Sequence, residues 1–339
     1  MESDLVIGGD VGGTHMRLAL VTLDGRILHH SKAATDVRAG VPNVVKRLIR
    51  QCLGMIDAAR GMGRLVRAVG LGVAGKIDRR QGIVLFSPNL PPLNGYPLAE
   101  DLRRVLPVPV VLENDADSFG VGEALLGAGR GISNWIGLTL GTGVGGCLIL
   151  GGRLWRGDDL GFCGEFGHMV VDPRGPRCAC GMRGCLEAHA SSSALKQGVR
   201  DAVKAGRLTG GPLHEACRSD TLTSELVYSQ ACQGDELARD LFSRMGWALG
   251  LAVAGLFSGL GVRHAILGGG VSNGWDRFIQ ALEESLAAHC SMLSPDEMVI
   301  RRGELGDDAA LVGSALLAHL RVSGPPADSR RLRPDPVRK

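Results

Sequence analysis

The sequence predicts a duplicated α/β fold with a cleft between its two halves, and two observations support this prediction. A strand, a glycine-containing turn and a second strand follow one another near the start of the chain, and the same pattern returns about 130 residues later. Between the two copies, apolar residues recur at helical spacing. Strands that alternate with helices favour a layered α/β fold, and the repeated pattern indicates that its core unit occurs twice.

The first copy is predicted to be a three-stranded β-meander. Its strands are expected at Leu5–Asp10, His15–Thr22 and Arg26–Ser31. The turn Gly12-Gly13 connects the first two strands, and Asp24-Gly25 is a hairpin signal before the third.

The segment that follows the meander is predicted to contain one helix and two buried strands. Valine, leucine, isoleucine and cysteine recur at helical spacing over residues 41–52, which predicts a helix. Val66–Val73 and Val108–Leu112 are almost wholly apolar, which is typical of strands buried on both faces. A helix that contains Gly122–Leu126 is expected next.

The second copy is predicted at Trp135–Leu140, with the turn Gly141–Gly146 and the strand Cys147–Leu150. The elements expected after it are a helix at Leu237–Leu260, a short strand at Ala265–Leu267 that ends in Gly268-Gly269-Gly270, and helices at Trp275–His289 and Asp308–Leu320. Glycines inside the long helix would allow another helix to pack closely against it.

Composition excludes several classes of protein. The 339 residues carry a net charge of only +3, so charge gives no general case for nucleic-acid binding. No uninterrupted apolar stretch has the length of a membrane span. Nine cysteines and a start without a secretory pattern indicate a reducing compartment, and we expect a cytoplasmic protein. Residues 322–339 are rich in arginine and proline, which predicts a disordered basic tail.

The turn of the first meander has the residues of a phosphate-binding loop. Asp10 ends the first strand, and Gly12, Gly13 and Thr14 follow it. Backbone N–H groups in such a turn can bind phosphate oxygens, and the Thr14 hydroxyl can add a hydrogen bond. Asp10 can hold Mg²⁺ or its water shell. An ordinary glycine hairpin is the alternative.

Gly141, Thr142 and Gly143 open a second candidate phosphate loop. The run Gly141–Gly146 also matches the dinucleotide-binding pattern, but that site needs a helix after the loop and the sequence predicts a strand. Gly70–Lys76 resembles a Walker A loop but is followed by Ile77 where a hydroxyl residue should hold Mg²⁺, so it receives little weight. Gly75 and Lys76 remain candidates to line the cleft.

Glu113-Asn114-Asp115-Ala116-Asp117 follows a predicted strand and precedes a predicted helix. A carboxylate at the end of a strand is well placed to act as a general base, and Asn114 could contact a pair of sugar hydroxyls. The alternative is that Asp115 or Asp117 caps the helix. Both interpretations hold if Asp117 caps the helix and Asp115 is catalytic.

A histidine and three cysteines form a complete tetrahedral set for structural zinc: His168, Cys178, Cys180 and Cys185. Clustered thiols in a glycine-rich loop favour a metal site over buried core cysteines. Glu165 and Glu187 flank the set without being needed as ligands. Carboxylates accept several hydrogen bonds, so these two are candidates for contacts with sugar hydroxyls. A filled zinc shell has no open position, which argues against catalytic zinc.

Taken together, these segments resemble the ROK family of sugar kinases and sugar-responsive repressors. The residues that carry the resemblance are Asp10–Arg17, Ser87–Pro91, Glu113–Asp117, Gly141–Gly146, Glu165–His168, Cys178–Glu187 and Leu267–Gly270. The resemblance implies an α/β fold of two actin-like (ribonuclease H-like) lobes with an interlobe cleft. Residues 1–115 and about 305–321 would form the first lobe, and residues 116–304 would form the second, with the zinc loop at 168–185.

The resemblance also implies ATP-dependent phosphorylation of a hexose at its 6-hydroxyl, with glucose as the expected sugar and with Mg²⁺ and structural Zn²⁺ as cofactors. Asp115 would be the catalytic base. The sugar-binding residues would be Gly75, Asn89, Asn114, Asp115, Glu165, His168 and Glu187. The nucleotide-binding residues would be Asp10, Gly12, Gly13, Thr14, Gly141, Thr142, Gly143, Gly268 and Gly269. The zinc ligands would be His168, Cys178, Cys180 and Cys185. A homodimer is expected.

Two departures from the family pattern matter for these expectations. Asp117 stands where asparagine is often found, which leaves two carboxylates competing for the role of base, and His15 replaces a usual lysine or asparagine. The alternatives are an N-acetylmannosamine or N-acetylglucosamine kinase, a non-catalytic sugar sensor, and polyphosphate as the phosphate donor. The first phosphate loop begins at Asp10, which leaves no room for the DNA-binding region of the repressors, so a kinase is expected.

Overall fold

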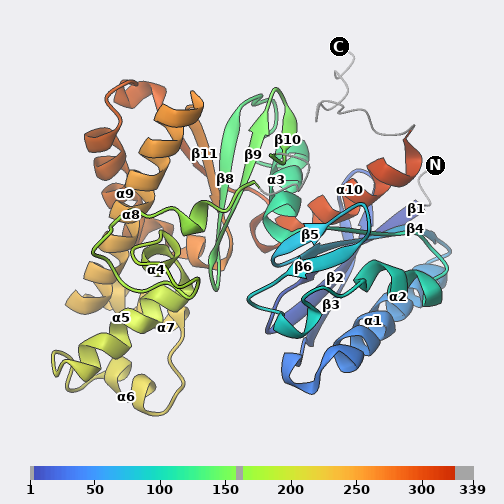
Figure 1. Cartoon of the computed structure of the whole chain (residues 1–339), viewed down its shortest axis with the longest axis horizontal. Coiled ribbons are helices and arrows are strands. Elements are labelled where there is room, and N and C mark those ends of the chain that lie inside the picture. Colours follow the sequence, from blue (N-terminus) through green and yellow to red (C-terminus); the bar gives the residue numbers. More distant parts are fainter. Residues whose placement is uncertain (1–3, 158–162, 325–339) are drawn as a thin grey trace. The chain divides into compact units, whose positions relative to one another are not determined.

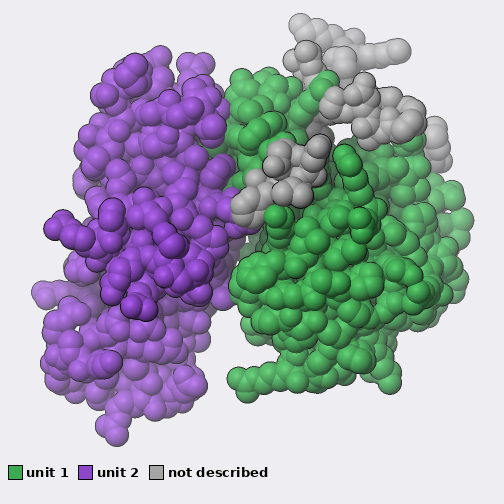
Figure 2. All heavy atoms as spheres, viewed as in Figure 1, with its two compact units in different colours: residues 1–137, 147–164, 303–339 green, residues 138–146, 165–302 purple. Residues whose placement is uncertain are grey.

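The computed structural model describes residues 4–157 and 163–324. The chain folds into two compact units (Figure 2): unit 1 holds residues 1–137, 147–164 and 303–339, and unit 2 holds residues 138–146 and 165–302. The lobes expected from the sequence divide the chain near residue 115 and again near residue 305. The units instead group residues 116–137 and 147–164 with the N-terminal part.

A five-stranded sheet forms the centre of unit 1 (Figure 1). Its strands are β1 (Asp4–Val11), β2 (His15–Thr22), β3 (Ile27–Ala34), β4 (Leu65–Val73) and β7 (Val110–Asn114), in the order β3-β2-β1-β4-β7. β1, β2 and β3 pair antiparallel, whereas β4 is parallel to β1 and β7 is parallel to β4. The meander predicted for the first copy is therefore confirmed.

Helices cover both faces of this sheet. α1 (Val41–Gly61) and α2 (Leu98–Val105) pack on one face, and α10 (Ala309–Ser323) packs on the other beside α3 (Asp115–Leu126). Residues of β1 alternate between the two cores: Leu5 and Ile7 join the side of α1, and Val6 joins the side of α10. α1 runs well past the helix predicted at residues 41–52 because buried apolar residues continue its periodicity.

The segment that resembles a Walker A loop has a different structure. Residues 70–76 span the end of β4 and the turn into β5 (Lys76–Asp78), which pairs with β6 (Ile83–Phe86). A strand follows the glycines here, where a phosphate-binding loop of that class needs a helix. The low weight given to this motif is confirmed.

A second five-stranded sheet has the order β10-β9-β8-β11-β12, and its strands are β8 (Trp135–Leu140), β9 (Val144–Leu150), β10 (Arg153–Trp155), β11 (His264–Gly268) and β12 (Val299–Arg302). Strand for strand this order matches β3-β2-β1-β4-β7, so the duplicated fold predicted from the sequence is confirmed. Because β9 directly follows Gly141–Gly143, the dinucleotide-binding interpretation of that loop is excluded as expected.

Helices make up most of unit 2, and they are α4 (Glu187–Ala190), α5 (Ser192–Lys204), α6 (Pro212–Arg218), α7 (Ser224–Gln233), α8 (Glu236–Leu260) and α9 (Trp275–His289). α8 is long and apolar enough to cross a membrane by length and composition alone, but 61% of its most apolar window is buried. Gly246 and Gly250 lie against the backbone of α9, so α8 is a core helix in close contact with its neighbour.

The C-terminal helix is longer than predicted. α10 ends at Ser323, so Val322 and Ser323, the first two residues of the expected basic tail, are helical. Gly324 is the C-cap of this helix, and residues 325–339 of the expected tail lie outside the described residues.

Candidate active site

The first glycine loop, Gly12-Gly13-Thr14, connects β1 to β2 and is held by two neighbouring segments of unit 1. The buried Thr35 donates a hydrogen bond from its hydroxyl to the Gly12 carbonyl oxygen (2.7 Å) and another from its backbone N–H to the Thr14 carbonyl oxygen (2.9 Å). Gly13 lies against the backbone of Asn89, and a Cβ atom at position 13 would overlap the Asn89 carbonyl oxygen. The fold therefore brings two predicted site segments, 12–14 and 89, into contact.

Asp10 is paired with an arginine on the neighbouring strand. Asp10 and Arg17 are directly opposite each other in the β1–β2 ladder, and the Arg17 guanidinium donates to Asp10 Oδ2 at 2.6 Å. Charge-assisted bonds of this kind fix the orientation of a carboxylate. Asp10 thus has a defined position one residue before the end of β1.

Asn114 is the N-cap of α3. Its Oδ1 accepts a hydrogen bond from the Asp117 backbone N–H (2.9 Å), and its Nδ2 donates to the Gly75 carbonyl oxygen (2.9 Å). The prediction that Asp115 or Asp117 caps this helix is wrong, because the strand continues to Asn114 and its amide oxygen accepts a free N–H group of the first turn. Asn114 therefore connects Gly75, a predicted sugar-site residue, to the start of α3.

Asp115 is the first residue of α3, and its side chain is only partly buried. Its Oδ1 accepts a hydrogen bond from the Ala116 backbone N–H at 3.0 Å. The N-terminus of a helix carries partial positive charge, which favours a carboxylate at this position.

Asp117, the other candidate for the base, is buried and faces a charged cluster inside unit 1. Arg156 donates to Glu113 Oε2 at 2.6 Å, and its Nε lies 3.8 Å from Asp117 Oδ2. Arg79 lies 3.8 Å from the other Glu113 oxygen. Burial raises the pKa of Asp117 well above its ordinary value, and the Glu113 carboxylate raises it further. Asp117 is buried among these side chains, so it is less accessible to a bound substrate than the partly exposed Asp115.

The second glycine loop, Gly141-Thr142-Gly143, connects β8 to β9 and belongs to unit 2. The Gly141 N–H donates to the Gly143 carbonyl oxygen (3.0 Å), and the Ser192 N–H at the start of α5 donates to the Gly141 carbonyl oxygen (2.9 Å). The Val144 N–H donates to Glu187 Oε2 at 3.0 Å. This loop is therefore anchored to the segment that begins α4 and α5.

The third glycine segment lies next to the second. Gly268 ends β11, and Gly269 has a φ of 84°, a conformation that side chains rarely adopt. A Cβ atom at position 269 would meet the backbone of Leu140, the residue before Gly141. Unit 2 thus brings the predicted nucleotide-binding glycines of β8–β9 and β11 together.

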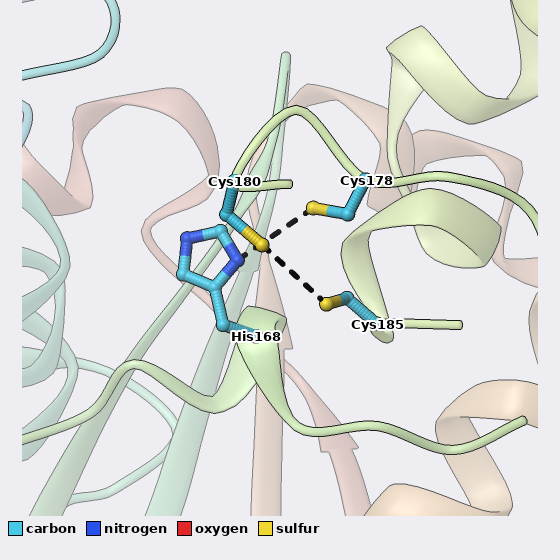
Figure 3. Close-up of side chains that lie close together, drawn as sticks. All are labelled: His168, Cys178, Cys180 and Cys185. Carbon is cyan, nitrogen blue, oxygen red and sulfur yellow. Dashed lines mark hydrogen bonds between the residues drawn. The ribbon is translucent and has the colours of Figure 1, made fainter. Parts of the chain in front are cut away.

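The predicted zinc ligands meet in unit 2 (Figure 3), where His168, Cys178, Cys180 and Cys185 place their ligand atoms within 4.8 Å of one another. The Cys180 and Cys185 sulfurs are 3.7 Å apart, and Cys178 Sγ is 3.7 Å from His168 Nδ1. These separations are far longer than a disulfide bond of about 2.05 Å. They match the edge of about 3.8 Å that a tetrahedron with zinc–sulfur bonds of about 2.3 Å would have. The residues therefore fit a zinc ion.

The two carboxylates that flank the cysteine–histidine cluster have different surroundings. Glu165 is exposed, and its Oε2 lies 3.9 Å from His168 Nε2, the ring nitrogen that is not directed at the sulfurs. Glu187 lies between the cluster and the second glycine loop, because its Oε1 is 3.7 Å from Cys178 Sγ while its Oε2 binds Val144.

The predicted site residues divide between the two units. Unit 1 holds Asp10, Gly12, Gly13, Thr14, Gly75, Asn89, Asn114 and Asp115, and unit 2 holds Gly141, Thr142, Gly143, Glu165, His168, Cys178, Cys180, Cys185, Glu187, Gly268 and Gly269. Sequence reasoning missed Thr35, Arg156 and Ser192, which support these residues from distant positions. Each belongs to a common residue type in an ordinary context, so the sequence contains no signal for its role.

Comparisons with known proteins agree with one another over nearly the whole chain. A family model described as the ROK family matches residues 6–321. A glucokinase from Thermotoga maritima is 36% identical over 325 residues, which cover 94% of this chain and 98% of that protein. A ROK family glucokinase from Streptomyces griseus, solved in complex with glucose and AMPPNP, is 33% identical with a TM-score of 0.79, covering 93% of this chain and 99% of that chain. An N-acetylmannosamine kinase from Escherichia coli is 28% identical, covering 91% of this chain and 96% of that protein.

Proposed function

Because the chain belongs to the ROK family, we propose that it is a kinase that transfers the γ-phosphoryl group of ATP to the 6-hydroxyl group of glucose. One structural observation carries this proposal. Asp115 stands partly exposed at the N-terminus of α3, and Asn114 fixes the start of that helix through both groups of its amide.

In the proposed reaction, Asp115 accepts the proton of the sugar 6-hydroxyl while the oxygen attacks the γ-phosphorus. A bond forms between this oxygen and phosphorus, the bond from phosphorus to the β–γ bridging oxygen breaks, and ADP leaves. The buried position of Asp117 beside Arg156 and Glu113 supports Asp115 as the base.

The phosphate groups of the nucleotide would be bound by the backbone N–H groups of the two glycine loops, with the Thr14 hydroxyl as a further donor. Asp10 would hold Mg²⁺ directly or through its water shell. The bound Mg²⁺ would neutralise charge on the transferring phosphoryl group. Arg17 occupies Oδ2 of Asp10, which favours a contact through the other oxygen.

The sugar hydroxyls would be bound by Asn89, Asn114, Glu165, His168 and Glu187. Asn114 keeps a second amide hydrogen and a second lone pair beyond its two hydrogen bonds within the protein, so it can still contact a hydroxyl pair. His168, Cys178, Cys180 and Cys185 would hold zinc in a closed, structural site.

An N-acetylmannosamine kinase is the second candidate, and the similarity to the Escherichia coli enzyme favours it. A sugar sensor without transfer activity is less well supported, because Asp115 and both glycine loops are intact. Polyphosphate could replace ATP as the donor, since backbone N–H groups bind phosphate oxygens of either molecule.

The experiment that tests this proposal measures ADP release from MgATP with glucose, N-acetylglucosamine, N-acetylmannosamine, mannose and fructose as acceptors. We expect glucose to be used with the highest kcat/KM. Turnover of N-acetylmannosamine with little or none of glucose would replace the proposed substrate. If no ADP is released with any sugar, and no sugar phosphate forms when polyphosphate replaces ATP, but calorimetry detects sugar binding, the sensor function replaces the kinase.

A further inference from the structure

The second glycine loop rests on the segment that carries the metal ligands. Gly167, directly before His168, lies against Val144, and a Cβ atom at position 167 would overlap the Val144 carbonyl oxygen. Glu187, two residues after Cys185, accepts the Val144 N–H through Oε2 at 3.0 Å. The carbonyl group and the N–H group of Val144 therefore both contact residues that lie within two positions of a predicted metal ligand.

The start of the loop is supported by the same segment. The Ser192 N–H donates to the Gly141 carbonyl oxygen at 2.9 Å, and the Ser191 hydroxyl donates to the Glu187 carbonyl oxygen at 2.8 Å. Gly143 lies against the Glu187 carboxylate, and a Cβ atom there would overlap Oε2. Glu187 thus contacts the loop at two consecutive residues, and its own position is fixed by the beginning of α5.

The metal ligands belong to the two arms that hold the loop. His168 lies in the first arm, directly after Gly167, and the three cysteines lie in the second arm, before Glu187. The arms are joined by a backbone hydrogen bond from the Leu186 N–H to the Met169 carbonyl oxygen (2.8 Å). Glu187 Oε1 is 3.7 Å from Cys178 Sγ, so a single carboxylate contacts a metal ligand on one side and the glycine loop on the other.

We propose that the cysteine–histidine loop positions the second glycine loop for the phosphates of a nucleoside triphosphate, and that Glu187 is the positioning residue that connects the two. An ion bound by His168 and the cysteines fixes the distance between the arms, and the arms fix Gly141, Gly143 and Val144. Ion occupancy and nucleotide affinity are therefore coupled. This inference rests on the proposed function, because it assigns nucleotide binding to this loop.

The test measures binding of AMPPNP with Mg²⁺ by calorimetry in the absence of sugar, together with the metal content of each preparation. Glu187→Ala removes the acceptor for the Val144 N–H, and we expect an increase in Kd of about tenfold, as expected for losing a hydrogen bond to a charged group. Glu187→Gln keeps an oxygen that can accept this bond and should recover part of the affinity. Asp172→Asn is the matched control, because Asp172 Oδ1 accepts the Arg174 N–H within the same loop, and its Kd should stay within about twofold of the wild type.

Chelation of the wild-type protein should weaken AMPPNP binding as well, and addition of Zn²⁺ should restore it. Unchanged AMPPNP affinity in a Glu187→Ala protein that keeps its metal would overturn this inference, even if the protein is a kinase. Wild-type protein that binds no nucleotide would overturn both this inference and the proposed function.

Discussion

The loop between β1 and β2 and the loop between β8 and β9 connect corresponding strands of two sheets that share one strand order. In the first loop, Thr35 donates hydrogen bonds to the Gly12 and Thr14 carbonyl oxygens, and the backbone of Asn89 packs against Gly13. In the second loop, the Glu187 carboxylate accepts a hydrogen bond from the Val144 N–H, and it also contacts the predicted metal ligand Cys178. The first strand–turn–strand unit is therefore held by backbone and hydroxyl groups. The second is held by a backbone N–H, that of Ser192, and in addition by a charged side chain within a metal-binding segment.

This difference has a physical consequence. A backbone neighbour cannot move without distorting the chain, whereas a side chain can rotate away from a new atom. The first loop should therefore tolerate less change in its glycines, and the second should depend more on the state of the metal site.

The largest expected difference between the loops comes from adding one methyl group to each. Gly13→Ala would force a Cβ atom into the Asn89 carbonyl oxygen, and we expect kcat/KM for ATP to fall by about a hundredfold, which corresponds to about 3 kcal/mol. Gly143→Ala would meet the movable Glu187 carboxylate, and we expect a fall of about tenfold. Steady-state kinetics with varied ATP measure both.

A double variant makes this comparison sharper. If Glu187 is the obstacle at position 143, Gly143→Ala combined with Glu187→Ala should cost less than the sum of the two single changes, because the groups are in contact. Additive losses, or a Gly143→Ala variant as inactive as Gly13→Ala, would show that the two loops do not differ in this way.

A smaller effect is expected on the local stability of the loops when metal is removed. Chelation should speed hydrogen exchange of the Val144 amide, since its acceptor Glu187 lies beside Cys178, and should leave the amides of residues 12–16 unchanged. Hydrogen exchange read by mass spectrometry measures peptides from both loops in one sample. Equal acceleration in both peptides would indicate general unfolding in place of a local coupling.

The smallest effect concerns Asp117, a buried acid in the same unit as the first loop. Burial and the Glu113 carboxylate raise its pKa, so between the ordinary Asp pKa and this raised value the folded protein binds a proton that the unfolded chain does not. Stability contributed by Asp117 is therefore lost as pH rises through that range. We expect Asp117→Asn to raise the free energy of unfolding at neutral pH by on the order of 1 kcal/mol. Denaturant unfolding at several pH values should show this gain disappear toward the ordinary Asp pKa, and an equal gain at every pH would contradict the account.

Much of the fold and the metal site could be predicted because their signals are local. The strand–glycine–strand units repeat within short stretches, and four metal ligands within residues 168–185 leave few geometries for a short loop. The N-cap of α3 could not be predicted from the sequence, because Asn114 and Asp115 are both good capping residues and only the end of β7 decides which of them is the cap.

Contacts between distant residues could not be predicted. Arg156 reaches Glu113 from the end of β10, and Glu187 reaches Val144 across 43 positions of sequence. A single arginine or glutamate has no periodicity or spacing that reveals its partner. The sequence also suggested Glu187 as a sugar contact, and only the fold shows that one of its oxygens holds the backbone of the glycine loop.

The central claim, that Asp115 is the base of a hexose kinase, is tested most directly by turnover and glucose binding of the Asp115→Asn and Asp117→Asn variants. Turnover is measured as ADP release from MgATP with glucose, and glucose affinity is measured by calorimetry. The account predicts that Asp115→Asn loses turnover while it still binds glucose, and that Asp117→Asn remains active. An active Asp115→Asn variant together with an inactive Asp117→Asn variant would contradict it.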